Sequence, residues 1–296
     1  MARLITRFAP SPTGRLHLGH AFSALTAWTL AQTLGGTFLL RMEDIDTARC
    51  RPDFEAGILD DLLWLGLTWP EPVMRQSARR PAYDAALARL HALGVTYRCT
   101  CTRGDIRAAL AAPQEGASLG PEGQVYPGMC RTLGLSGPGG AIRLDLRRAL
   151  DLAGPVSFSE TGPLHAGEHW LDAPSMLAEV GDIVLARRDI GTSYHLAVVV
   201  DDAAQGVTHV VRGADLFSAT PIHRLLQQLL TLPTPIYHHH RLIRDSTGKR
   251  LAKRDDARAL AAYRAEAASP EDIRGLLGFQ ASGRVSSTSA PSRSAV

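Results

Sequence analysis

Two histidines three positions apart, His17 and His20, lie where a Pro- and Gly-containing loop meets an Ala/Leu-rich helical pattern. A short apolar run precedes the loop, so the stretch is typical of a strand, a loop and a helix start. Gly14 and Gly19 permit a close approach of a ligand to the backbone. A helix N-terminus offers backbone N–H groups and the positive end of the helix dipole. The stretch therefore predicts a site for a polyanion such as a nucleotide triphosphate.

Charged side chains follow two further apolar runs. The acidic segment Glu43–Asp46 comes directly after the predicted strand Thr37–Met42, where open α/β sheets place their ligands. Arg212 follows the predicted strand 207–211, and an arginine there can hold an anionic group through a two-pronged contact. The alternatives are a surface arginine at Arg212, which the residue favours without further context, and a solvated acidic loop, which fits Asp46 better than Glu43.

Three of the four cysteines, Cys99, Cys101 and Cys130, lie within one segment that is poor in apolar residues. This clustering favours a metal over disulfides. Zinc prefers four ligands, and the fourth could be Tyr126, His165 or His169. The alternative is three reduced cysteines on neighbouring strands. A metal would stabilise a segment with so little apolar material.

The 32 basic residues include only two lysines, Lys249 and Lys253, in one polar Gly-containing loop. Two ammonium groups in a chain that otherwise uses arginine indicate a place where guanidinium does not serve. The consecutive histidines 238–240 cannot all face one way in a strand, so no metal site is expected there.

Alternating strand and helix patterns must position these groups. We expect helices at about 20–34, from Pro52, from Pro81 and over 221–230. This alternation predicts a doubly wound parallel sheet. The run 194–202 fits either a buried strand or a helix packed beneath one. The predicted divisions are the first half of the α/β domain (1–95), a zinc-binding insertion (96–166) and the second half of the α/β domain (167–235). A loop with a helical part (236–278) and a disordered tail (279–296) are predicted to follow.

Composition sets outer bounds. At 296 residues and 45% hydrophobic, the chain is expected to fold as one large domain or two ordinary ones. A net charge of +3 is too small to indicate nucleic-acid binding alone. No window is apolar enough for a membrane span and no signal-peptide pattern is present, so we expect a cytoplasmic protein.

Taken together, these residues resemble the catalytic core of class I aminoacyl-tRNA synthetases. Pro10–Gly14 with His17–His20 is similar to the HIGH signature in its glutamyl form, and Arg250–Arg254 is similar to the KMSKS loop. Further segments match glutamyl-type enzymes: 41–46, 66–69, 76–79 and 211–216. The resemblance covers residues 3 to about 260 and implies a Rossmann-like doubly wound parallel sheet.

Within that class the chain resembles the truncated family of glutamyl-queuosine tRNA(Asp) synthetases. Only roughly forty residues follow the KMSKS-like loop, so we expect a short helical C-terminal part and no anticodon-binding domain. The family activates glutamate without tRNA and attaches it to queuosine in the anticodon of tRNA(Asp). Its zinc pattern is matched by Cys99, Cys101, Tyr126 and Cys130. The implied partners are L-glutamate, ATP and queuosine-containing tRNA(Asp), with no membrane, and the chain is expected to be a monomer.

The resemblance also implies roles for single residues. His17, Gly19, His20 and Lys253 would bind ATP, which brings Mg²⁺, and all of these except the glycine would be catalytic. The glutamate site would consist of Arg7 and Arg212 on the side-chain carboxylate, Ser11, Glu43 and Tyr194 at the amino end, and Phe8, Ala9 and Pro10. Arg250 and Ala252 depart from the KMSKS pattern.

Two rival functions follow from the same motifs. One is a truncated glutamyl-tRNA synthetase that charges the acceptor end of tRNA(Glu). The other is a catalytically silent synthetase paralogue that only binds tRNA. Glutamate-dependent ATP–pyrophosphate exchange without tRNA separates the expected function from both.

Overall fold

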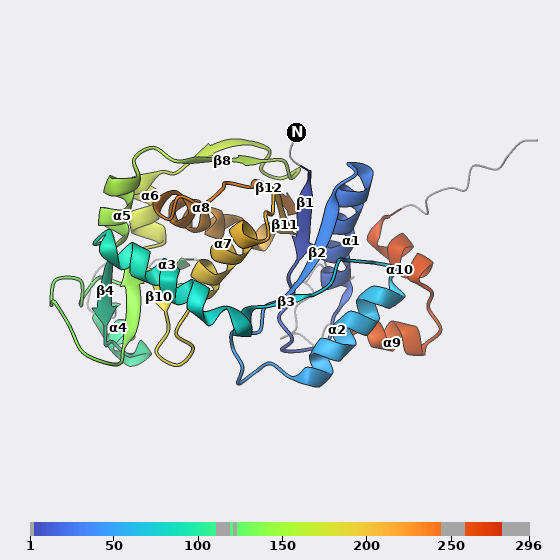
Figure 1. Ribbon diagram of the computed structural model, residues 1–296, viewed down its shortest axis with the longest axis horizontal. Helices are drawn as coiled ribbons and strands as arrows, with labels where there is room; N and C mark the ends of the chain where they lie inside the picture. Colours follow the sequence, from blue (N-terminus) through green and yellow to red (C-terminus); the bar gives the residue numbers. More distant parts are fainter. Residues whose placement is uncertain (1–2, 111–118, 121–122, 244–257, 280–296) are drawn as a thin grey trace, which may run out of the picture.

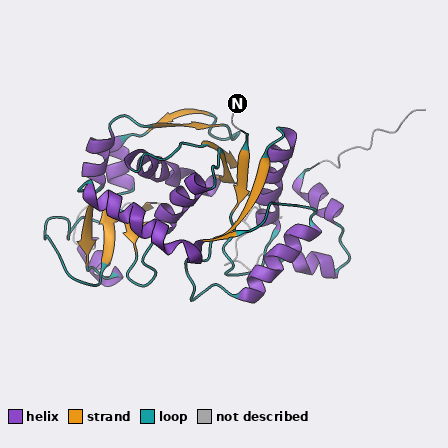
Figure 2. Ribbon diagram, viewed as in Figure 1, coloured by secondary structure: helices purple, strands orange, loops and turns teal. Residues whose placement is uncertain are grey.

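A parallel sheet forms the centre of the molecule. The computed structural model describes residues 3–110, 119–120, 123–243 and 258–279 (Figures 1 and 2). The N-terminal half of the sheet pairs β1 with β2 and β2 with β3, all in parallel. Its elements are β1 (Ile5–Phe8), α1 (Leu18–Thr33), β2 (Thr37–Met42), α2 (Pro52–Trp64) and β3 (Met74–Arg75).

The C-terminal half of the sheet continues beside β1. The backbone N–H of Thr208 donates to the Ile5 carbonyl at 3.0 Å, which brings the next strand alongside. From there the order is β11 (His209–Gly213), β12 (Ile236–His240), β8 (Ser157–Glu160) and β9 (Gly167–Trp170), parallel except for the β8–β9 pair. The predicted doubly wound parallel sheet is therefore confirmed.

A separate three-stranded antiparallel sheet carries Cys99. It consists of β4 (Thr96–Cys99), β7 (Ala141–Leu144) and β10 (Val184–Ala186). The predicted zinc-binding insertion, 96–166, contains both β7 and β8. β7 belongs to this antiparallel sheet, whereas β8 joins the central sheet by pairing with β12. The exact division into domains stays a prediction.

Helices lie beside both sheets in Figure 2. The run 194–202, for which strand and helix were both open, is helical: Ser193 caps it by accepting the Leu196 N–H at 3.4 Å, and most of its apolar side chains are buried. The remaining elements are η1 (Gln76–Arg79), α3 (Arg80–Ala92), α4 (Arg103–Leu110), β5 (Leu119–Gly120), β6 (Gly123–Gln124), α5 (Leu146–Ala153), α6 (Ala173–Glu179), α7 (Tyr194–Ala204), η2 (Ala214–Ala219), α8 (Thr220–Leu229), α9 (Leu260–Ala265) and α10 (Pro270–Leu277).

Two large apolar cores hold these elements in place. In the first, small side chains of α1 such as Ala24 and Ala27 let this helix approach β1 and β2 closely. Leu260, Ile273 and Leu277 bring α9 and α10 into the same core, beside α1 and α2 (Figure 1). The second core lies among α3, α5, α7 and α8.

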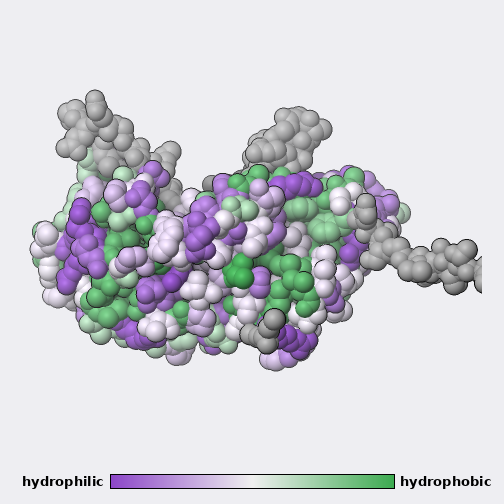
Figure 3. Space-filling view, turned by 90° about the horizontal axis from the view of Figure 1, so that it is seen from above, coloured by the Kyte–Doolittle hydropathy of each residue, from purple (hydrophilic) through white to green (hydrophobic). Residues whose placement is uncertain are grey.

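Hydrophilic and hydrophobic residues are interspersed over the face seen in Figure 3. None of the helices in the described part of the chain combines the length and apolarity that crossing a lipid bilayer requires. The KMSKS-like loop with Lys249, Arg250, Ala252 and Lys253, and the tail from residue 280, lie outside the described residues.

Candidate active site

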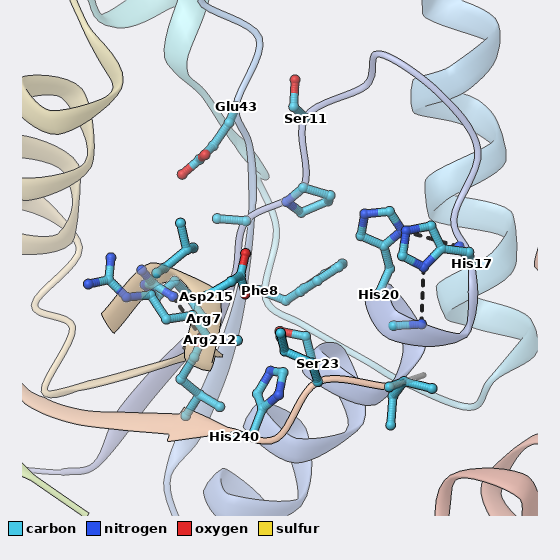
Figure 4. A pocket seen from close by; sticks show the side chains of 18 of the residues that line it. Arg7, Phe8, Ser11, His17, His20, Ser23, Glu43, Arg212, Asp215 and His240 are labelled. Atoms are coloured by element: carbon cyan, nitrogen blue, oxygen red, sulfur yellow. Dashed lines mark hydrogen bonds between the residues drawn. The ribbon is translucent and has the colours of Figure 1, made fainter. Parts of the chain in front are cut away.

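A cavity of about 570 Å³ opens where β1, β2, β11 and β12 end. It brings together eleven of the residues predicted to bind glutamate or ATP, namely Arg7, Phe8, Ala9, Pro10, Ser11, His17, Gly19, His20, Glu43, Tyr194 and Arg212. In Figure 4, Arg7, Arg212 and Asp215 gather on one side, His17 and His20 lie opposite, and Phe8 stands between the two groups. The cavity thus has two ends of different chemistry. Lys253 lies outside the described residues.

The two histidines cap helix α1. The Nδ1 of His17 accepts the Gly19 N–H at 3.1 Å, and the His17 N–H donates to the Nδ1 of His20 at 3.1 Å. Because both Nδ1 atoms accept, the proton of each neutral ring is on Nε2. The ring centroids are 3.8 Å apart. The loop therefore presents two ring N–H donors side by side at a helix N-terminus.

Arg7 is held by a carboxylate that we did not predict. Its Nε and Nη2 bind the two oxygens of Asp202, and Nη1 donates to the Val211 carbonyl at 3.2 Å. Burial raises the pKa of the Asp202 carboxyl, but the charges of Arg7 and Arg41 outweigh it and hold the pKa below the usual value. Asp202 therefore stays ionised and fixes the direction of Arg7.

Arg41 is fully buried and links Asp202 to Glu43. Its Nη1 lies 2.7 Å from Asp202 Oδ1, and its Nη2 lies 3.3 Å from Glu43 Oε1. Burial nevertheless raises the pKa of the Glu43 carboxyl above its usual value. A carboxylate that is desolvated in this way gains most from a further cation such as an ammonium group. Arg41 and Glu43 both belong to segment 41–46, which matches glutamyl-type enzymes. The sequence does not indicate that Arg41 bridges Glu43 and Asp202.

Arg212 has uncharged partners instead. Its Nε donates to His239 Nε2 at 2.9 Å, its Nη1 to His223 Nδ1 at 3.0 Å, and its Nη2 to Thr220 Oγ1 at 2.9 Å. Burial lowers the pKa of both imidazoles, so both are neutral at pH 7. No carboxylate of the described residues forms an ion pair with this buried arginine. Its charge is therefore available to an anionic ligand.

Tyr194 stands where the cavity meets a second cleft. The tyrosine is the first residue of α7, it is partly buried, and burial raises the pKa of its phenol. The neighbouring cleft, of about 660 Å³, shares Ser11, Glu43 and Tyr194 with the cavity. Arg49 and Arg187 are among its other lining residues. The site is therefore open to a second reactant from a side away from His17 and His20.

The three clustered cysteines meet as predicted. Their sulfur atoms all lie within 4.8 Å of one another, the only such group of three or more His, Cys, Asp or Glu side chains in the described part of the chain. Tyr126 Oη lies 3.4 Å from the sulfurs of Cys99 and Cys101 and accepts the Cys130 N–H at 2.9 Å. Zinc–sulfur bonds of about 2.3 Å fit sulfurs at this spacing. The donor set therefore suits zinc.

The other two candidates for a fourth ligand are engaged elsewhere. His165 stacks on Phe217 with ring centroids 3.9 Å apart, and His169 stacks on Phe158 at 5.2 Å. The guanidinium of Arg143 lies 3.9 Å from the centre of the Tyr126 ring and packs on the ring face. Of the three candidates, the fold brings only Tyr126 to the sulfurs.

Comparison with known proteins gives one consistent family. Residues 3–133 and 172–284 match the family model of the catalytic domain of class I tRNA synthetases (E and Q). A protein of Rhodobacter capsulatus named glutamyl-Q tRNA(Asp) synthetase is 62% identical over 93% of this chain and 100% of its own length. A protein of the same name from Geobacter sulfurreducens is 46% identical over 88% of this chain and 79% of its own.

Solved structures agree in fold. A glutamate-tRNA synthetase from Elizabethkingia anophelis superposes with a TM-score of 0.76 at 25% identity. A glutamate tRNA ligase from Elizabethkingia meningosepticum in complex with its amino acid gives 0.75 at 26% identity. Each alignment covers 94% of this chain and 61% of the other, so the chain spans about three fifths of their length.

Proposed function

This chain belongs to the glutamyl-Q tRNA(Asp) synthetase family of class I tRNA synthetases, and we propose that it activates L-glutamate with ATP, without tRNA, and then transfers glutamate to queuosine in the anticodon of tRNA(Asp). The single observation that carries the proposal is the buried charge of Arg212, which has only neutral partners among the described residues. A buried cation of this kind is stabilised by a ligand carboxylate. On this proposal the enzyme works in the cytoplasm as a monomer.

The amino acid binds at the arginine end of the cavity. Arg212 takes the side-chain carboxylate together with Arg7, while Ser11, Glu43 and Tyr194 surround the α-amino group. The raised pKa of the Glu43 carboxyl supports this direction, because an ammonium ion would favour the ionised form of Glu43. Phe8, Ala9 and Pro10 complete the wall between the two ends. The α-carboxylate then points toward the histidine end.

ATP binds at the histidine end. His17 and His20 donate from Nε2 to the phosphates, and Gly19 leaves room for adenine. The α-carboxylate of glutamate attacks the α-phosphorus in line, which gives glutamyl-adenylate and pyrophosphate. Catalysis is chiefly positioning and stabilisation of phosphate charge, so no covalent enzyme intermediate is needed. Lys253 would supply a positive point charge to the β- and γ-phosphates, and Mg²⁺ bound with ATP would share the triphosphate charge.

The second step needs a nucleophile on the other side of the adenylate. We place the queuosine ring in the cleft that shares Ser11, Glu43 and Tyr194 with the cavity. A ring hydroxyl attacks the adenylate carbonyl, an ester forms, and AMP leaves. Arginines along this cleft such as Arg49 and Arg187 suit the phosphates of the anticodon loop.

Zinc has a structural role in this proposal. Cys99, Cys101, Tyr126 and Cys130 would hold one ion, which would clamp the antiparallel sheet to the loop that carries Tyr126. These residues lie apart from those that line the cavity, with Cys101 alone reaching the neighbouring cleft. We expect the ion to stabilise the insertion rather than to take part in either chemical step.

Transfer of radiolabelled glutamate to tRNA(Asp) tests the function. Label is expected on tRNA(Asp) that contains queuosine and not on tRNA(Asp) that lacks it, and ATP–pyrophosphate exchange is expected with glutamate alone. Exchange that requires tRNA(Glu), with label on its acceptor end, would establish the truncated glutamyl-tRNA synthetase instead. No exchange under any of these conditions would favour a silent tRNA-binding paralogue.

A further inference from the structure

A buried carboxylate lies behind Arg212. Glu160, the last residue of β8, is 3% exposed, and its Oε2 is 2.5 Å from the Nδ1 of His239. The other ring nitrogen of His239, Nε2, accepts the Nε–H of Arg212 at 2.9 Å. Glu160 and His239 are both absent from the described residues that line the cavity. They can act on a ligand only through Arg212.

The protons in this line of hydrogen bonds have one arrangement. A guanidinium can only donate, so Nε2 of His239 carries no proton and Nδ1 carries it. Nδ1 then donates to Glu160. Burial raises the pKa of the Glu160 carboxyl, but hydrogen bonds from His239 and Gly162 bring it down to about 2, so this acceptor is ionised. The direction of every bond from Glu160 to Arg212 is therefore determined.

The backbone is shaped around the same carboxylate. Oε1 of Glu160 accepts the N–H groups of His239 at 2.9 Å and of Gly162 at 2.5 Å. A Cβ atom at Gly162 would lie 2.2 Å from the His239 carbonyl oxygen, so only glycine lets the chain turn this closely. These contacts hold Oε1 against the backbone and leave Oε2 for the imidazole.

Two further histidines, His223 and His195, lie on another side of the Arg212 guanidinium. His223 accepts from Nη1 through Nδ1, so its Nε2 donates to the Nδ1 of His195 at 3.0 Å. With Thr220 on Nη2, three of the five guanidinium N–H groups have described partners. The remaining two N–H groups, one on each Nη atom, are donors that the two oxygens of a carboxylate can accept.

We propose that Glu160 and His239 are positioning residues that orient the Arg212 guanidinium so that its two remaining N–H groups meet the side-chain carboxylate of the amino acid. The proposal rests on the proposed function, because Arg212 is taken as the residue that holds this carboxylate. It assigns a role in substrate recognition to a glutamate on β8 that does not touch the substrate.

Glu160→Gln is the decisive variant. The two backbone N–H groups require an oxygen at the Oε1 position, so the amide NH₂ must occupy the Oε2 position and donate to His239. His239 must then accept at Nδ1 and carry its proton on Nε2, which points a donor at the donor Nε–H of Arg212. We expect the KM for glutamate in pyrophosphate exchange to rise about 10- to 100-fold and the KM for ATP to change less than about twofold.

Glu168→Gln is the matched control. Glu168 lies on β9 of the same hairpin, is exposed, and bonds Ser159 rather than a histidine. We expect its glutamate KM to equal that of the wild type. Glu160→Asp retains a carboxylate acceptor, so it should recover much of the glutamate affinity that Glu160→Gln loses. An equal loss in both Glu160 variants would indicate a packing role and overturn the proposal.

Nitrogen-15 NMR of the histidine rings tests the proton arrangement without any activity. The wild type is expected to carry the His239 proton on Nδ1, and Glu160→Gln is expected to carry it on Nε2. A wild-type His239 protonated on Nε2 overturns the proposal even if no Glu160 variant folds, and so does an unchanged glutamate KM in folded Glu160→Gln. If wild-type His239 has the expected tautomer but the protein shows no glutamate-dependent ATP–pyrophosphate exchange, the proposed function is wrong and the positioning of Arg212 is not.

Discussion

Arg7 and Asp202 are 195 positions apart in the chain and are joined by two hydrogen bonds beneath the cavity, Nε–Oδ1 at 3.1 Å and Nη2–Oδ2 at 3.4 Å. The pair joins β1, the first strand of the parallel sheet in chain order, to α7, the helix that comes after β10 of the antiparallel sheet. Arg41 binds the same carboxylate from β2 at 2.7 Å. One carboxylate thus sets the position of two buried guanidinium groups.

Asp202→Asn is expected to destabilise the protein strongly. The change leaves Arg7 and Arg41 buried without their shared anion, and breaking a buried pair in this way costs about 3–5 kcal/mol. Urea denaturation measures the free energy of unfolding. Asp189→Asn is the control, because its pair with Arg187 is solvent-exposed and should contribute less than about 1 kcal/mol. Equal losses in the two variants would contradict this view of Asp202.

His17→Asn separates helix capping from catalysis. Asparagine caps helices well, so the free energy of unfolding should change by less than about 1 kcal/mol. The Nε2–H donor is lost, and the rate of glutamate-dependent exchange should fall about 10²- to 10³-fold. His91→Asn, an exposed histidine on α3, serves as the control. A rate within twofold of the wild type would remove His17 from the catalytic group.

Acid should weaken the fold because His223 and His239 resist protonation. Burial lowers the pKa of both imidazoles in the folded protein, and Arg212 lowers them further. Below the unfolded value of about 6.5, the unfolded chain binds protons that the folded chain does not, so stability falls as pH falls. Each histidine contributes up to about 1.4 kcal/mol per pH unit.

Urea denaturation between pH 7.5 and 5.5 measures this slope. His223→Asn retains an acceptor for Arg212 but cannot titrate, so its stability should depend less steeply on pH. His91→Asn should keep the wild-type slope. A steeper slope in His223→Asn than in the wild type would show that the sign is wrong.

Metal analysis of the purified protein is expected to find about one zinc per chain. Cys130→Ser should lower that content and the melting temperature, because the metal joins segments that have few apolar contacts of their own. Cys50→Ser should change neither, since Cys50 lies outside the sulfur cluster. A normal melting temperature in zinc-free protein would show that the three cysteines are ordinary reduced thiols and do not form a structural metal site.

Much of this protein can be predicted because the signals are local. The loop from Pro10 to His20 sets its own helix start, and the paired spacing of Cys99 and Cys101 marks a metal-type site without any distant information. Alternating strand and helix patterns likewise predicted the parallel sheet, the motif resemblance indicated the synthetase family, and both are confirmed. The roles of the individual site residues stay predictions.

Only the tertiary structure decided which partners hold those residues. Asp202 was one of two adjacent acids at the end of an apolar run, and nothing local distinguishes it from Asp201, whose carboxylate binds Arg79 instead. Glu160 and His239 meet because β8 and β12 pair in one register, across 79 positions of sequence. Such contacts depend on strand order and burial, which the whole fold determines. The sequence alone therefore indicated residues that line the cavity, and the fold decided what orients them.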